Sequence, residues 1–162
     1  MGDPGRVPRT AARVALLDDA DCLFLLRYDD EEIGPHWAMP GGGSDPGETA
    51  EETVKRELEE ETGWSDLHVG PELWIWEHDF TLRGVPVHQT ERIFLSRGPR
   101  REPARNLQLS HERDGILGWC WWTPRQIANP VEALWPSELP TLFAGLRAVG
   151  APAAPIDLRV GS

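Results

Sequence analysis

Three glutamates in the first half of the sequence, Glu57, Glu60 and Glu61, are the residues best suited to chemistry. In a helix, Glu57 and Glu61 are an i, i+4 pair on one face, and Glu60 lies beside them. Like charges at this spacing destabilise an exposed helix by roughly 0.2–0.5 kcal/mol per pair, and by more where the helix faces a core. A divalent cation would remove the repulsion, because hard ions such as Mg²⁺ bind carboxylate and carbonyl oxygens. The spacing favours a metal site; the alternative is an acidic helix that only faces solvent.

A helix over residues 49–62 would position these glutamates. Ala50, Val54 and Leu58 fall on one apolar stripe at about 100° per residue, which predicts the face that packs on a core. Gly63 follows directly, and glycine is common just past the C-terminus of a helix. Three glycines and a Ser-Asp-Pro-Gly turn come before the helix. The stretch therefore predicts a loop followed by a helix, with the acidic patch at the edge of the buried stripe.

The full pattern resembles the Nudix box, G-x5-E-x7-R-E-U-x-E-E-x-G-U, where U is an apolar residue. Gly42 and Glu48 fill the first two fixed positions, and residues 56–63 (RELEEETG) fill the rest of the pattern up to its last position. Trp64 stands at that last position instead of the usual aliphatic residue. The resemblance implies an α/β fold in which a mixed β-sheet is sandwiched between helices (α/β/α), with the box as a loop-helix-loop at one end of the sheet.

The resemblance also implies roles for individual residues. The metal, Mg²⁺ or Mn²⁺, would be bound by Glu57, Glu60, Glu61 and the backbone carbonyl of Gly41. The structural positions of the box would be Gly42, Glu48, Arg56 and Gly63, with Glu48 bracing the loop or pairing with Arg56.

Two residues outside the box complete the predicted site. Arg27, at the end of an apolar run, is the candidate for contacting substrate phosphates, and a surface arginine without that role is the alternative. Glu112, in an arginine-rich loop, is the candidate for a further metal ligand or general base, with Asp114 second. Glu57 and Glu112 compete for the role of base, and the sequence does not choose between them.

The function implied by the resemblance is metal-dependent hydrolysis of a nucleoside diphosphate linked to another group X. The markers of ADP-ribose, dinucleoside polyphosphate and coenzyme A hydrolases are missing, and a nucleoside triphosphate pyrophosphohydrolase of the MutT kind remains open. The alternative is a non-catalytic Nudix module that senses a nucleotide or binds a protein. Such modules usually lose box glutamates, and this chain keeps them.

The charge and apolar content of the chain limit the kinds of binding partner that we expect. The 162-residue chain carries a formal net charge of −11, which argues against binding a nucleic-acid polymer, because phosphate backbones need basic surface. No apolar run is long enough to cross a membrane, and the N-terminus has no signal-peptide pattern, so we expect a cytoplasmic location. The expected partner is a small phosphorylated nucleotide, and a homodimer is possible.

In chain order, we expect a flexible lead-in (1–9), a single Nudix domain (10–150) and a poorly ordered tail (151–162). Apolar runs at 11–17 and 22–28 predict a hairpin, as do 67–82 and 85–96. A strand at 116–122, a short helix starting at Thr123 and a final helix over 137–149 follow. Trp74 and Trp76 share one strand face and are expected to be buried, although they could instead contact a nucleobase.

Overall fold

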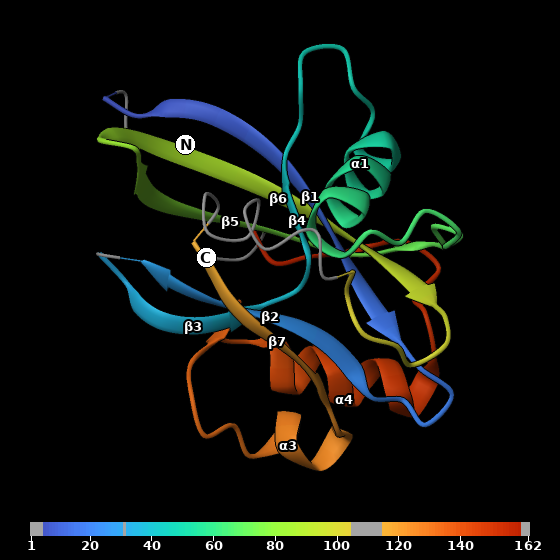
Figure 1. Ribbon diagram of the computed structural model, residues 1–162. Helices are drawn as coiled ribbons and strands as arrows, with labels where there is room; N and C mark the ends of the chain where they lie inside the picture. The colour runs from blue at the N-terminus through green and yellow to red at the C-terminus, as the bar shows by residue number, and fades with distance from the viewer. Residues whose placement is uncertain (1–4, 31, 105–114, 160–162) are drawn as a thin grey trace.

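The computed structural model describes residues 5–30, 32–104 and 115–159. Its strands form one mixed sheet in the order β8-β3-β2-β1-β6-β5-β9, with β4 paired to β1 and β7 paired to β2 (Figure 1). The strands are β1 (Val7–Leu17), β2 (Leu23–Asp30), β3 (Gly34–Ala38), β4 (Gly41–Gly43), β5 (Glu72–Leu82), β6 (Val85–Arg97), β7 (Ile116–Trp122), β8 (Leu134–Trp135) and β9 (Ile156–Asp157). The helices are α1 (Ala50–Thr62), α3 (Pro124–Ala128) and α4 (Leu139–Val149).

The sheet divides into two halves that meet at the turn after β1. β1 runs parallel to β6 along its whole length, from Val7 opposite Val87 to Leu17 opposite Arg97. By contrast, β1 pairs with β2 only where Leu17 lies opposite Leu23. The predicted turn is present, but its two strands diverge instead of forming a long hairpin ladder. This divergence separates the β1-β6-β5 half from the β2-β3-β7 half (Figure 1).

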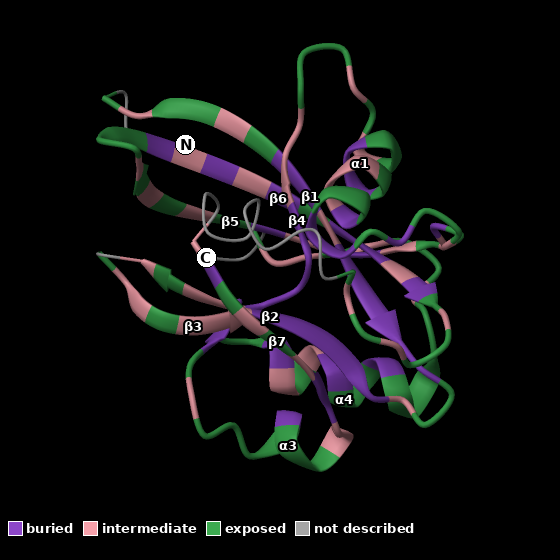
Figure 2. Ribbon diagram, viewed as in Figure 1, coloured by how far each residue is buried: buried purple, intermediate pink, exposed green. Residues whose placement is uncertain are grey.

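Helices cover both faces of the sheet, as the predicted α/β/α arrangement requires. Helix α1 packs on β1 and β4, and its Val54 and Leu58 are buried in one apolar cluster with Phe24 and Trp121. Helices α3 and α4 lie together on the opposite side (Figure 2). The α4 stripe of Leu139, Phe143 and Leu146 is buried in a second cluster there.

Several strands and helices begin at other residues than predicted. Strand β1 begins at Val7, so residues 7–9 belong to the sheet and not to a lead-in, because β6 supplies their hydrogen-bonding partners. β9 pairs with β5, so part of the predicted tail also joins the sheet. Strand β5 begins at Glu72 rather than at residue 67. Helix α4 begins at Leu139, with Glu138 as its N-cap, rather than at residue 137.

The hairpin of β5 and β6 matches its prediction at the turn. Arg83 and Gly84 both have positive φ, 49° and 82°, which is the mirror-image turn whose twist suits a two-residue hairpin. Pro86 lies at the start of β6, before its pairing with β1 begins, so the missing N–H is tolerated.

Candidate active site

The box helix is fixed at both ends by local contacts. The hydroxyl of Thr49 accepts a hydrogen bond from the Glu52 backbone N–H, and the Glu52 carboxylate accepts one from the Thr49 N–H, which is a capping box. At the other end Gly63 adopts the left-handed conformation (φ 84°), and its N–H donates to the Glu59 carbonyl at 2.8 Å. The predicted helix is therefore confirmed to within one residue.

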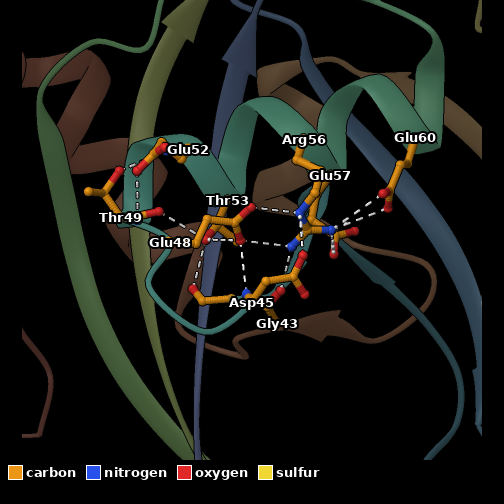
Figure 3. Close-up of polar contacts among 10 residues, drawn as sticks. Gly43, Asp45, Glu48, Thr49, Glu52, Thr53, Arg56, Glu57 and Glu60 are labelled. Atoms are coloured by element: carbon orange, nitrogen blue, oxygen red, sulfur yellow. Dashed lines mark hydrogen bonds and ion pairs between the residues drawn. The ribbon is translucent and has the colours of Figure 1, made fainter.

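Arg56 joins the box loop to the box helix (Figure 3). Its guanidinium donates to both carboxylate oxygens of Glu48, at 2.8 and 2.9 Å, and to the carbonyl of Gly43 at 2.8 Å. These bonds confirm the predicted pairing of Glu48 with Arg56. The hydrogen bond from Arg56 is the main reason that the pKa of Glu48 falls to about 2. A second carboxylate, that of Glu57, lies 3.0 Å from the same guanidinium, so Arg56 also fixes one predicted metal ligand.

Glu61 is buried although it carries a carboxylate. Its two oxygens accept hydrogen bonds from the backbone N–H of Gly41 at 2.8 Å and from the hydroxyl of Tyr28 at 3.1 Å. Burial, and then the nearby charge of Glu57, raise the pKa of Glu61 well above its usual range. The negative charges of Glu57 and Glu61, two of the predicted metal ligands, therefore repel each other, and the neighbouring groups offset only part of that repulsion.

Gly42 allows the loop to approach these carboxylates. A Cβ atom at Gly42 would lie 2.7 Å from the carboxylate carbon of Glu57. Any larger residue would therefore displace that side chain or the loop. This steric limit explains why the first fixed position of the box is a glycine.

Glu60 is placed differently from the other two glutamates. Its side chain is 51% exposed and lies 3.4 Å from Arg56. Within the described residues, no three acidic, histidine or cysteine side chains are already gathered in a way that could hold a metal ion. Glu57, Glu60 and Glu61 nevertheless line the same cleft, and the partly shielded pair of Glu57 and Glu61 has the donor chemistry that a hard cation needs.

The cleft has a volume of about 840 Å³ and is lined by residues of both halves of the sheet and of α1. Aromatic rings form much of its wall away from the box: Tyr28, His36, Trp76, His78, Phe80 and Trp135. On β5, the ring of His78 stacks between Trp76 and Phe80, with centroid distances of 4.3 and 4.9 Å. Trp76 is thus both a core residue, as predicted, and part of the cleft wall, whereas Trp74 is only core.

A buried carboxylate that the sequence reading missed joins the box side of the cleft to its aromatic wall. Glu91 on β6 is fully buried and accepts hydrogen bonds from Arg13 Nε at 2.5 Å and from His78 Nε2 at 2.8 Å. It also accepts from Trp76 Nε1 at 3.1 Å and Gln89 Nε2 at 2.7 Å. Burial alone would raise the pKa of Glu91, but the charge of Arg13 and the hydrogen bond from His78 outweigh it and hold that pKa well below its usual range.

The signal for this network was the strand pattern of β6. Gln89 and Glu91 alternate with more exposed residues and share one face with the buried Val87 and Ile93. Two polar side chains on an otherwise apolar strand face indicate a buried polar site. The partner Arg13 lies on β1, and only the register of β1 against β6 brings it within reach.

Of the two predicted site residues outside the box, the structure describes Arg27 and not Glu112. Arg27 does not line the cleft; it pairs with Glu132, with Nη2 to Oε2 at 3.0 Å. Its role in substrate binding stays a prediction. Glu112 and Asp114 lie outside the described residues.

Comparisons with known proteins agree with this geometry. The NUDIX domain family matches residues 7–143. An RNA pyrophosphohydrolase from Erythrobacter litoralis is 48% identical over 58 residues, which cover 35% of each chain. The nucleoside triphosphatase NudI of an Enterobacter species is 36% identical over 88 residues, which cover 54% of this chain and 62% of the relative. In both comparisons, the matched part is less than two thirds of the relative's length.

Solved structures share the fold. The MutT protein from Methanosarcina mazei superposes with a TM-score of 0.66 and 17% identity, over 90% of this chain and 96% of that one. A UDP-X diphosphatase gives a TM-score of 0.63 at 19% identity, over 94% of this chain and 69% of that one.

The protein belongs to the Nudix family, and its fold is the Nudix α/β/α fold. Four residues of the box line one side of the cleft: Gly42, Glu57, Glu60 and Glu61. In the part of the chain that the structure describes, no helix is both long and apolar enough to span a membrane.

Proposed function

We propose that this protein hydrolyses the pyrophosphate linkage of a nucleoside diphosphate bound to a further group X, with Mg²⁺ or Mn²⁺ as cofactor. The observation that carries the proposal is the pair of box carboxylates, Glu57 and Glu61, at the wall of a cleft that also offers aromatic rings. Relatives named as an RNA pyrophosphohydrolase and a nucleoside triphosphatase support this substrate class.

The donor set fits a divalent cation. The raised pKa of Glu61, caused by burial and by Glu57, marks a place where added positive charge would be stabilising. Glu57, Glu61 and the Gly41 carbonyl would hold the ion, and Glu60 would join them after leaving Arg56. When bound, such an ion supplies charge for phosphate oxygens and lowers the pKa of a water molecule.

The chain's own residues then prepare the reaction. The Gly41 N–H and the Tyr28 hydroxyl orient the Glu61 carboxylate, and Arg56 orients that of Glu57. One carboxylate must accept a proton from the attacking water. Glu57 is the described candidate, and Glu112 remains the alternative from outside the described residues.

The aromatic wall fits the nucleoside part of the substrate. Flat rings offer stacking area and edge contacts to a heteroaromatic base, and Trp76 and His78 are held in place by the buried Glu91. A substrate bound in this way would extend from the box carboxylates toward β5 and β8.

A substrate panel tests the proposal. Nucleoside triphosphates, nucleotide sugars, dinucleoside polyphosphates and a 5′-triphosphorylated oligonucleotide would each be incubated with Mg²⁺, with Mn²⁺ and with chelator, and released phosphate and pyrophosphate measured. We expect metal-dependent turnover of at least one small nucleotide. Turnover of none of them with either ion would refute the proposal.

Variants of α1 link the activity to the box. We expect Glu61→Gln to lower kcat by at least about a hundredfold, because an amide oxygen is a poorer ligand for a hard cation. Glu59→Gln is the matched control, since Glu59 is an exposed glutamate of the same helix and does not line the cleft. Equal rates in the two variants would contradict the assigned site.

A further inference from the structure

Arg9 lines the cleft and forms no ion pair with a carboxylate of the described residues. In this acidic protein most described arginines form an ion pair: Arg6, Arg13, Arg27, Arg56, Arg92, Arg97, Arg101, Arg147 and Arg159. Within the described residues, the arginines that form none are Arg9, Arg83, Arg100 and Arg125. Only Arg9 and Arg83 of this unpaired group line the cleft. Two arginines that form no ion pair with a described residue thus line the cleft in which a polyanion would bind.

A neutral side chain holds Arg9 in place. The Arg9 guanidinium donates through Nη1 to the amide oxygen of Gln89, which is buried and in turn donates to Glu91. An amide fixes the position of the guanidinium without cancelling its charge. Within the described part of the chain, the bond to Gln89 occupies one of the five N–H donors of Arg9, and a guanidinium binds phosphate oxygens in a bidentate manner.

Arg9 lies directly against the box loop. A Cβ atom at Gly43 would overlap the Arg9 guanidinium, so glycine at this position makes room for it. The Glu57 carboxylate acts electrostatically on Arg9 from the box side. Burial, and then the charge of Arg13, lower the pKa of Arg9; the charge of Arg83 acts in the same direction, and the carboxylate of Glu91 acts against it, as that of Glu57 does. The cleft therefore has a negative wall on α1 and a positive wall on β1, with the glycine loop between them.

We propose that Arg9, supported by the charge of Arg83, binds the substrate phosphate that is next to the phosphate held at the box carboxylates. This inference rests on the proposed function and deepens it. It assigns phosphate binding to strand β1 and the turn after β5, in place of Arg27, and it requires a substrate with at least two consecutive phosphates. Gln89 is the positioning residue of this site.

Binding of inorganic tripolyphosphate, measured by calorimetry without metal, tests the site apart from catalysis. We expect Arg9→Met to weaken binding about tenfold or more, because the substitution removes charge-assisted hydrogen bonds to phosphate oxygens. Arg9→Lys keeps the charge but loses bidentate contact and should be intermediate. Arg125→Met, an exposed unpaired arginine of α3, is the matched control and should bind as the wild type.

The active substrate from the panel gives a second readout. Arg9→Met should raise KM by a similar factor while kcat changes less. Gln89→Met keeps the Arg9 charge and should raise KM less than Arg9→Met, which keeps the proposal testable if the latter unfolds. If folded Arg9→Met turned over substrate at the wild-type rate and with the wild-type KM, the arginine site alone would be overturned. Arginine-dependent tripolyphosphate binding without turnover of any substrate would overturn the proposed function and retain this site.

Discussion

Replacing Glu91 by glutamine tests how strongly the buried network supports the cleft. The substitution keeps the shape of the side chain but removes its charge. Arg13 then keeps a buried charge opposite a neutral amide, and two of the four donors that converge on Glu91 face an NH₂ group in place of an oxygen. Breaking one partner of a buried ion pair costs about 3–5 kcal/mol. In a protein of this size that loss lowers Tm by about 6–20 °C.

A matched control separates burial from charge. Glu132→Gln also removes the carboxylate of an arginine pair, that with Arg27, but the Glu132 side chain is 37% exposed whereas that of Glu91 is 1% exposed. Exposed pairs contribute about 0–1 kcal/mol. Urea and thermal denaturation of both variants would be compared with the wild type. A loss below about 1 kcal/mol for Glu91→Gln, or equal losses in the two variants, would refute the reasoning.

The same variant has a defined pH dependence. The folded-state pKa of Glu91 lies below the ordinary value of 4.5, so the ionised form stabilises the fold at neutral pH. That contribution is complete above the unfolded-state pKa and is lost as pH falls through the folded-state pKa. The difference in stability between wild type and Glu91→Gln should therefore be largest near neutral pH and shrink below about pH 4.5. A difference that stays constant down to pH 3 would contradict the assignment.

Two further predictions concern the box loop and the core. Gly42→Ala should lower turnover more than tenfold in a folded protein, because its Cβ would lie 2.7 Å from the Glu57 carboxylate. Gly118→Ala is the control: its Cβ would meet open space, so turnover in the same assay should be unchanged. Phe143 of α4 is 2% exposed, and Phe143→Ala should lower the free energy of unfolding by about 3–5 kcal/mol, measured by urea denaturation. A loss below about 1 kcal/mol would mean that packing of α4 on the sheet contributes little to the core.

The box helix and its bracing were accessible from sequence because their contacts are local. The Thr49 capping box, the Gly63 C-cap and the pair of Glu48 with Arg56 span at most a few turns of chain. Helical periodicity then fixes which side chains share a face. The same reasoning placed Glu60 with Glu57 and Glu61, but its exposed position beside Arg56 depends on rotamers that spacing does not specify.

The sequence by itself therefore determined the family, the α/β/α class and the acidic side of the cleft, since these follow from a motif of fixed spacing and from short-range periodicity. Only the tertiary structure decided the opposite side. There Arg13 meets Glu91 across 78 residues and Arg9 meets Gln89 across 80, whereas Arg27 meets Glu132 across 105 residues away from the cleft. Such pairs depend on strand register, and a shift of one residue turns every side chain of a strand to the other face. No local pattern carries that register, because it is set by how the whole sheet assembles around its two cores.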